Sequence, residues 1–70
     1  MSFNWCFIGC GKLAHTVAQQ MKKHGGHKIV SCYTRNFDNG RAFGEKFGAV
    51  AYDNANDAIL HEGVDAVYIV

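Results

Sequence analysis

Short apolar runs alternate with stretches of helical periodicity along the whole 70-residue chain. The apolar runs predict four strands, at Trp5–Gly9, Lys28–Tyr33, Ala49–Tyr52 and Asp65–Val70. The stretches between them predict three helices: Lys12–His24, a second from an Asn36 cap to about Phe47, and a short third through Leu60 and His61. Strands joined by such helices run parallel, because a right-handed crossover needs the intervening helix. The pattern therefore predicts an α/β fold, the first half of a Rossmann-type doubly wound parallel sheet (β-α-β-α-β-α-β, strand order 3-2-1-4).

Each helical stretch has a face expected to lie on the sheet. In the first stretch the apolar stripe comprises Leu13, Ala14, Val17, Ala18 and Met21. In the second, the inner face comprises Phe37, Gly40, Phe43, Gly44 and Phe47. The two glycines there each cost roughly 1 kcal/mol of helix stability relative to alanine, so close helix–sheet contact is their expected use. The third helix is expected to begin at Asn54 or Asn56 and to be closed by Gly63.

The turn after the first strand reads Gly9-Cys10-Gly11-Lys12-Leu13-Ala14, the alanine form of the G-x-G-x-x-G dinucleotide fingerprint. Gly9 would permit a tight turn out of the strand, and Gly11 would let backbone approach a pyrophosphate. Ala14 is small enough for the helix to pack on the strand. The free N–H groups at Lys12 and Leu13 would face the diphosphate at the positive end of the helix dipole. We therefore expect the residues from Gly9 to Leu13 to bind the cofactor.

A glycine turn with a purely structural role is the alternative, because a strand–helix turn can need glycine without binding a ligand. A Walker A loop is excluded, since Leu13 follows Gly11-Lys12 where Ser or Thr would stand, and the four-residue spacer is absent. The place of the motif, between the first predicted strand and helix, favours dinucleotide binding.

The end of the second predicted strand indicates which dinucleotide is preferred. An NAD-specific site carries an Asp or Glu there for the ribose hydroxyls, whereas this chain has Thr34, Arg35 and Asn36. Arg35 offers a permanently charged donor fork for a 2′-phosphate, and Thr34 and Asn36 add further donors. These three residues predict NADP. NAD is the alternative, with Arg35 stacked on adenine and Asp38 reaching the ribose.

Composition narrows the range of partners. A formal net charge of +1 gives no electrostatic footprint for nucleic acid or an anionic membrane. The chain has no run of about 18 apolar residues, and its N-terminus does not resemble a signal peptide. Three cysteines without a secretion signal favour a reducing, cytoplasmic location.

The cysteines and histidines do not form a predicted metal site. Cys6 and Cys10 straddle a strand and its turn, and Cys32 lies on the next strand, which is not the spacing of a zinc site. We expect all three to be small buried side chains. His15 lies beside the apolar stripe of the first helix, where packing or surface exposure is its expected role.

Four consecutive segments resemble the Gfo/Idh/MocA oxidoreductases, the glucose–fructose oxidoreductase and inositol dehydrogenase family: WCFIGCGKLAHTVAQQM, VSCYTRN, AFGEKFGAVAYDN and GVDAVYIV. Members of that family join an N-terminal Rossmann domain to a C-terminal α/β domain that binds substrate. The resemblance implies a dehydrogenase that transfers hydride between NAD(P) and a sugar, cyclitol or related alcohol or aldehyde. It also implies a homo-oligomer when full length.

The predicted last strand stops without a turn or cap, so residues 1–70 are expected to be the N-terminal part of a dinucleotide-binding domain in a longer protein. The family's Glu-Lys-Pro motif and its substrate-domain Asp and His would follow residue 70. No catalytic residue is therefore assigned, and the 70 residues alone are expected to be inactive and poorly stable. A non-catalytic dinucleotide-binding or redox-sensing module is the alternative function.

Overall fold

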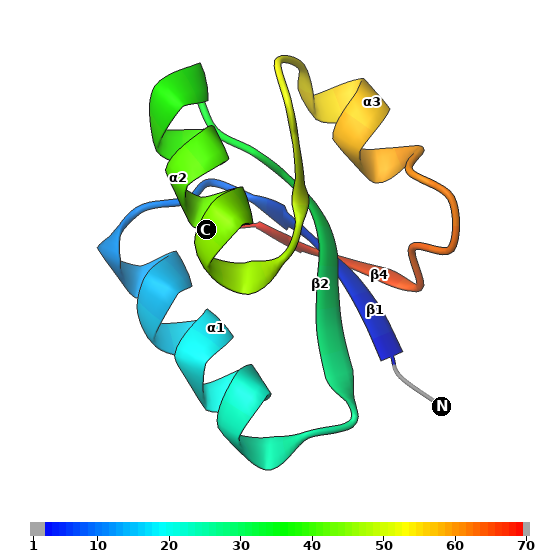
Figure 1. Ribbon diagram of the computed structural model, residues 1–70. Coiled ribbons are helices and arrows are strands. Elements are labelled where there is room, and N and C mark those ends of the chain that lie inside the picture. Colours follow the sequence, from blue (N-terminus) through cyan, green and yellow to red (C-terminus); the bar gives the residue numbers. More distant parts are fainter. Residues whose placement is uncertain (1–2, 70) are drawn as a thin grey trace.

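The computed structural model describes residues 3–69 and confirms the alternation of strands and helices (Figure 1). The elements are β1 (Phe3–Ile8), α1 (Lys12–His24), β2 (His27–Tyr33), α2 (Phe37–Phe47), β3 (Val50–Tyr52), α3 (Ala55–Ile59) and β4 (Ala66–Ile69). The four strands form one parallel sheet in the order β3-β2-β1-β4, as predicted.

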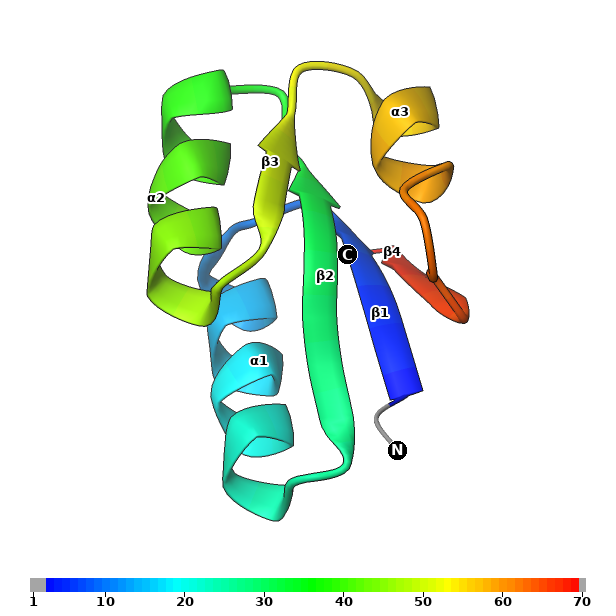
Figure 2. The same ribbon diagram turned by 45° about the vertical axis from the view of Figure 1, so that its right-hand side comes forward.

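The helices cover both faces of the sheet. Figure 2 shows α1 and α2 on one side and α3 on the other. Two neighbouring residues of β2 show the alternation of a strand. The Ser31 hydroxyl donates to the Ala58 carbonyl of α3 over 2.7 Å, whereas the Cys32 thiol donates to the Gly40 carbonyl of α2 over 3.5 Å. The sheet is therefore the middle layer of three.

The main core lies between the sheet and the pair α1 and α2. Phe7 of β1 and Phe43 of α2 are the largest fully buried side chains among the described residues, and their ring centroids are 5.6 Å apart. The other buried members of the cluster are Cys10, Ala14, Ala18, Ile29 and Cys32. All three cysteines of the chain are buried, as predicted.

Close contact between α2 and the segment that leads from it into β3 explains why residue 44 is glycine. A Cβ placed on Gly44 would lie 2.5 Å from the carbonyl oxygen of Ala49. The Ala49 N–H in turn donates to the Gly44 carbonyl over 2.9 Å. Glycine at this position is therefore required by packing, as the sequence predicted.

Two apolar residues predicted to face the sheet do not do so. Leu13 is 58% exposed and Phe37 is 42% exposed. Each lies in the first turn of its helix, and in α1 the neighbouring Ala14, in the same turn, takes the buried position instead. The helical periodicity was correct, but the buried face begins one residue later in α1, at Ala14, and three residues later in α2, at Gly40.

The third helix is shorter than predicted. It begins after the Asn54 cap and ends at Ile59, with Leu60 as its C-cap, rather than continuing through His61. His61 instead has its ring Nδ1 2.7 Å from the Tyr52 hydroxyl at the end of β3. The loop then returns to β1, because Asn4 Nδ2 donates to the Gly63 carbonyl over 2.9 Å. These long-range contacts end the helix early.

Strand ends differ from the prediction by a few residues. β1 begins at Phe3 and β2 at His27, while β3 begins at Val50. β4 is described as far as Ile69, and the predicted end of that strand, Val70, lies outside the described residues.

Candidate functional site

The turn between β1 and α1 is held against the end of β2. Gly9 has φ 97°, a conformation that side chains other than glycine rarely adopt, so the predicted tight turn is present. The Gly9 N–H and the Cys10 thiol both donate to the Tyr33 carbonyl, over 2.6 and 3.7 Å. The last residue of β2 therefore fixes the position of the turn.

Gly11 has a different reason to be glycine. Its φ of −81° is open to any residue, and a Cβ placed on it would meet no atom within 4 Å. Neither backbone conformation nor packing within the described residues requires glycine here. The space that a side chain would fill lies at the start of α1, which is where the sequence predicted that a pyrophosphate approaches the backbone.

The N-terminus of α1 has no side-chain cap. Gly11 occupies the cap position, whereas Asn36 caps α2 by accepting the Asn39 N–H, and Asn54 caps α3 in the same way. Because the first N–H groups of a helix have no intrahelical acceptor, the amides of Lys12 and Leu13 remain available for an anion. Ala14 is fully buried, as its predicted packing role requires.

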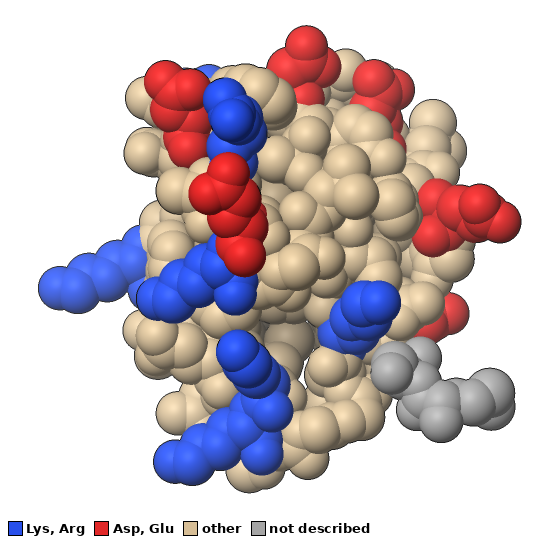
Figure 3. Space-filling model, in the orientation of Figure 1, with Lys and Arg blue, Asp and Glu red and all other residues tan. Residues whose placement is uncertain are grey.

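The charges on α1 are compatible with an anionic ligand at its first turn, while its basic residues Lys22, Lys23 and His24 lie in the last turn. The helix contains no acidic residue along its length. In the view of Figure 3 the lower left part of the surface carries Lys and Arg side chains and no carboxylate, while most carboxylates gather toward the upper and right edges. No carboxylate of α1 therefore opposes a phosphate at its first turn.

The second predicted group follows β2. Thr34 is partly buried, and Arg35 and Asn36 are exposed. The Asn36 Oδ1 accepts the Asn39 N–H over 3.2 Å, so its Nδ2 donors remain free to point outward. Because β1 and β2 are parallel neighbours, with Ile8 opposite Tyr33, both groups leave the same edge of the sheet. Asp38, the residue of the NAD alternative, is exposed in the first turn of α2.

His15 packs beside the apolar stripe of α1, as predicted, but its contact with the turn was not predicted. Its Nδ1 lies 3.0 Å from the Gly11 carbonyl, and because a carbonyl only accepts, the ring donates. The same ring packs edge-on against Phe43, with centroids 5.1 Å apart, and against Phe47. The spacing of four residues between Gly11 and His15 on a helix was the available indication. His15 therefore links the turn to α2.

The thiols beside the turn affect each other. A hydrogen bond with Cys32 lowers the pKa of the Cys10 thiol below its ordinary value. The same hydrogen bond, together with burial, raises the pKa of Cys32 strongly. Burial raises the pKa of Cys6. Cys10 is thus the member of the Cys10–Cys32 pair that ionises first.

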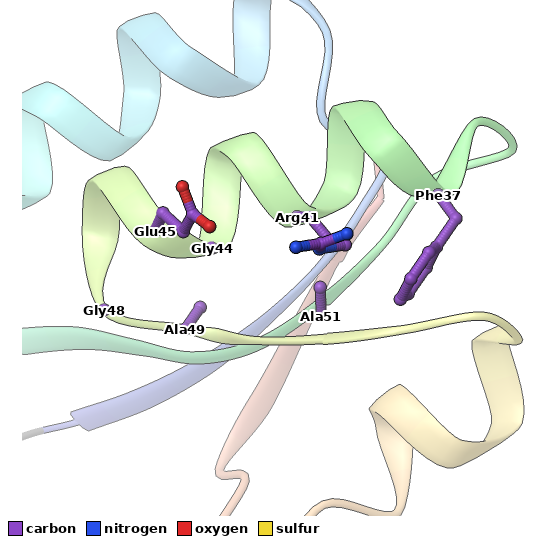
Figure 4. Close-up of a pocket in the computed structure, with 7 residues that line it drawn as sticks. All are labelled: Phe37, Arg41, Gly44, Glu45, Gly48, Ala49 and Ala51. Atoms are coloured by element: carbon purple, nitrogen blue, oxygen red, sulfur yellow. The ribbon is translucent and has the colours of Figure 1, made fainter.

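The larger described cavity lies elsewhere. It has a volume of about 450 Å³ between α2 and β3, and Figure 4 shows the Arg41 guanidinium above Ala51 at its centre. Its lining comprises Phe37, Arg41, Gly44, Glu45, Gly48, Ala49 and Ala51. None of the predicted cofactor residues lines it.

Within residues 3–69 no helix is long and apolar enough to cross a membrane.

Comparison with known proteins identifies a family whose model matches this chain and several solved structures that resemble it. The model of the Gfo/Idh/MocA group, described as "Oxidoreductase family, NAD-binding Rossmann fold", matches residues 3–70. No curated protein sequence matches the chain.

Several solved structures share the fold. An oxidoreductase of Desulfitobacterium hafniense DCB-2, described as NADPH-dependent, is 26% identical with a TM-score of 0.91, and the match covers 100% of this chain and 20% of that one. A 3-ketoreductase of Actinomadura kijaniata, in complex with NADP and TDP-benzene, is 22% identical with a TM-score of 0.87, covering 97% and 21%. A dehydrogenase of Chromobacterium violaceum, in complex with NADH and UDP-GlcNAcA, is 18% identical with a TM-score of 0.89, covering 99% and 20%. The chain thus spans about a fifth of each of these structures.

Proposed function

The chain belongs to the Gfo/Idh/MocA oxidoreductase family, whose NAD-binding Rossmann domain it matches, and we propose that it is the cofactor-binding part of an NAD(P)-dependent dehydrogenase. The full-length protein would transfer hydride between a nicotinamide dinucleotide and a sugar, cyclitol or related alcohol or aldehyde. The observation that carries this proposal is the open, uncapped start of α1 behind Gly11, where a Cβ would meet no protein atom.

The residues of the turn bind the cofactor without taking part in the chemistry. The backbone N–H groups of Lys12 and Leu13 donate to the pyrophosphate, and Gly9 and Gly11 give it access to the backbone. Cys10 points its thiol inward to the Tyr33 carbonyl, so its backbone rather than its side chain faces the ligand. When bound, the nicotinamide ring of the cofactor would donate or accept the hydride.

We infer a preference for NADP over NAD from the end of β2. No carboxylate stands among Thr34, Arg35 and Asn36, so nothing in this segment repels a 2′-phosphate. Arg35 is exposed and supplies a planar pair of donors, and Asn36 keeps its Nδ2 donors after capping α2. Asp38 lies beyond this segment, in the first turn of α2, which leaves it as the alternative partner for an NAD ribose.

The substrate and its catalytic groups belong to the part of the protein after residue 70. The 3-ketoreductase and the Chromobacterium dehydrogenase were solved with a TDP derivative and UDP-GlcNAcA respectively, which supports a sugar-type substrate for the family member proposed here. The proposal includes cytoplasmic location and homo-oligomerisation of the full-length protein. It assigns no catalytic residue to residues 1–70.

Titration of the full-length protein with NADPH and NADH tests the cofactor assignment. We expect NADPH to bind more tightly, and Arg35→Ala to weaken NADPH binding by about tenfold, the size of a lost hydrogen bond to a charged group, with less effect on NADH. Arg41→Ala is the matched control, because Arg41 lies on α2 away from the turn and lines the separate cavity. Equal affinity for the two cofactors, or equal weakening of both by Arg35→Ala, would contradict the NADP assignment.

A non-catalytic redox-sensing module is the second candidate function, and the paired thiols of Cys10 and Cys32 beside the turn are the observation that favours it. Substrate screening of the full-length protein separates the two. Oxidation of NADPH coupled to reduction of a sugar-type carbonyl supports the dehydrogenase, whereas tight NADPH binding without turnover on any such substrate supports the sensor.

A further inference from the structure

Two of the three thiols lie on one face of the sheet, directly behind the turn. Cys10 and Cys32 belong to the same buried cluster between the sheet and α1 and α2. The Cys32 thiol is close enough to act as a hydrogen-bond donor to an ionised Cys10 sulfur, which lowers the pKa of Cys10 and raises that of Cys32. Cys6 is on the opposite face of the sheet, where its side chain hydrogen-bonds with Ser31, the residue that contacts α3. The chain therefore contains one thiol pair and one separate thiol.

Each thiol of the pair is also anchored to backbone. The Cys10 thiol donates to the Tyr33 carbonyl over 3.7 Å, and the Cys32 thiol donates to the Gly40 carbonyl of α2 over 3.5 Å. Cys32 and Tyr33 are consecutive in β2, and the Tyr33 carbonyl also accepts the Gly9 N–H. The Cys10 sulfur is thus held where the turn meets the end of β2, and the Cys32 sulfur lies between β2 and α2.

Access to the pair is one-sided. Cys10 retains 5% of its surface exposed, whereas Cys6 and Cys32 are fully buried. Cys10 stands between Gly9 and Gly11, next to the open space at the start of α1. Cys10 is therefore the more accessible thiol of the two, on the side where the dinucleotide is proposed to bind.

We propose that Cys10 and Cys32 form an oxidisable dithiol, which a peroxide converts to a disulfide that weakens dinucleotide binding at the adjacent turn. Formation of the disulfide rests on the shared buried cluster and backbone contacts of the two thiols and on their mutual effect, and not on the function of the turn. Its effect on binding also rests on the proposed function of the turn.

The oxidation transfers two electrons from the pair of thiols to the peroxide. The Cys10 thiolate attacks one oxygen of the peroxide, the O–O bond breaks, and Cys10 becomes a sulfenic acid as the other oxygen leaves as water after taking up a proton. The Cys32 sulfur then attacks the Cys10 sulfur, the S–O bond breaks, and the hydroxyl leaves as a second water with the Cys32 proton. The lowered pKa of Cys10 increases its thiolate fraction, which favours it as the first site of attack.

The disulfide alters the turn because Cys10 is part of it. Bond formation removes the S–H donor that holds Cys10 to the Tyr33 carbonyl and draws the sulfur toward Cys32. Disulfide geometry is narrow, so the backbone between Gly9 and Gly11 follows the sulfur. The donors that face the pyrophosphate then lose their alignment. A bound dinucleotide covers the same turn and so protects Cys10 from peroxide.

Mass spectrometry of the full-length protein tests the disulfide directly. Reduced protein is treated with hydrogen peroxide, alkylated and digested with trypsin. We expect a linked pair of peptides, Met1–Lys12 with Ile29–Arg35, lighter by two hydrogens than the free thiol peptides, and we expect NADPH to slow its formation. The first peptide also contains Cys6, so the Cys6→Ser variant is needed to place the bond at Cys10.

Matched variants make the outcomes decisive. Cys6→Ser is expected to keep the linked peptides, and Cys10→Ser and Cys32→Ser are each expected to lose them. Titration with NADPH is then expected to show about tenfold weaker binding by the oxidised wild type, the size of a lost hydrogen bond to a charged group, with recovery in dithiothreitol. A link through Cys6, or no link in protein that binds NADPH, overturns the proposal while the proposed function stands.

Two other outcomes test the coupling to the turn and the proposed function separately. A disulfide that forms without change in NADPH affinity overturns the coupling to the turn. Reduced protein that binds neither NADPH nor NADH contradicts the proposed function, and the linked peptides then still decide whether the dithiol exists.

Discussion

At the scale of single residues, a substitution at Gly11 distinguishes an effect on ligand binding from an effect on stability. Its φ of −81° suits alanine, and an added Cβ meets no protein atom within 4 Å. We therefore expect Gly11→Ala to leave the melting temperature unchanged or slightly higher, because alanine lowers the entropy of the unfolded chain by the equivalent of about 0.4–1 kcal/mol. We also expect dinucleotide binding to weaken by about tenfold or more, since the methyl group occupies the space for the pyrophosphate. Thermal denaturation and NADPH titration of the full-length protein measure the two effects.

Gly9→Ala is the contrasting substitution for that experiment. Gly9 has φ 97°, so alanine there is strained by roughly 1–2 kcal/mol and is expected to lower stability as well as binding. If Gly11→Ala destabilised the protein as much as Gly9→Ala, Gly11 would be a structural turn residue and the ligand explanation would be wrong.

At the scale of an element, α2 tests the packing of helix on sheet. A Cβ on Gly44 would lie 2.5 Å from the Ala49 carbonyl oxygen, a backbone atom that cannot move without moving β3. We expect Gly44→Ala to destabilise the protein by about 1–3 kcal/mol, despite the higher helix propensity of alanine, because overpacking outweighs propensity here. Chemical denaturation measures the change. Glu45→Ala, an exposed neighbour on the same helix, is the control and is expected to change stability by less than about 0.5 kcal/mol.

At the scale of the whole molecule, the 70 residues have a small core and an open sheet. β3 and β4 form the two edges of the described sheet, and Ile69 on β4 is 74% exposed. An unpaired apolar edge pairs readily with other chains. We expect the 70 residues expressed alone to self-associate or to unfold without a cooperative transition, and to show no hydride transfer. Size-exclusion chromatography and thermal denaturation check this, and a monodisperse monomer with a sharp melting transition would contradict it.

Local spacing along the chain was enough to predict the elements and their order. Lys12–His24 was predicted with the observed bounds, and the Asn36 cap and the end at Phe47 were correctly predicted for α2. Parallel strands and the order 3-2-1-4 followed from helix-length connections, because chain geometry allows few alternatives. The positions of Gly9 and Gly11 at the end of β1 followed from the same pattern. Their contact with a cofactor stays a prediction.

Tertiary structure decided what depends on residues distant in sequence. Leu13 and Phe37 fit the apolar periodicity but are exposed, since the buried faces of the two helices begin at Ala14 and Gly40. The third helix stops at Ile59, because His61 meets Tyr52 and the following loop bonds to β1. Cys10 and Cys32 are 22 residues apart in number and become a pair only where β1 and β2 lie side by side. The sequence by itself determined which segments are strands and helices, because hydrogen bonding and side-chain periodicity are local; exposure, helix ends and thiol pairing were decided by the tertiary structure, because they depend on which segments pack together.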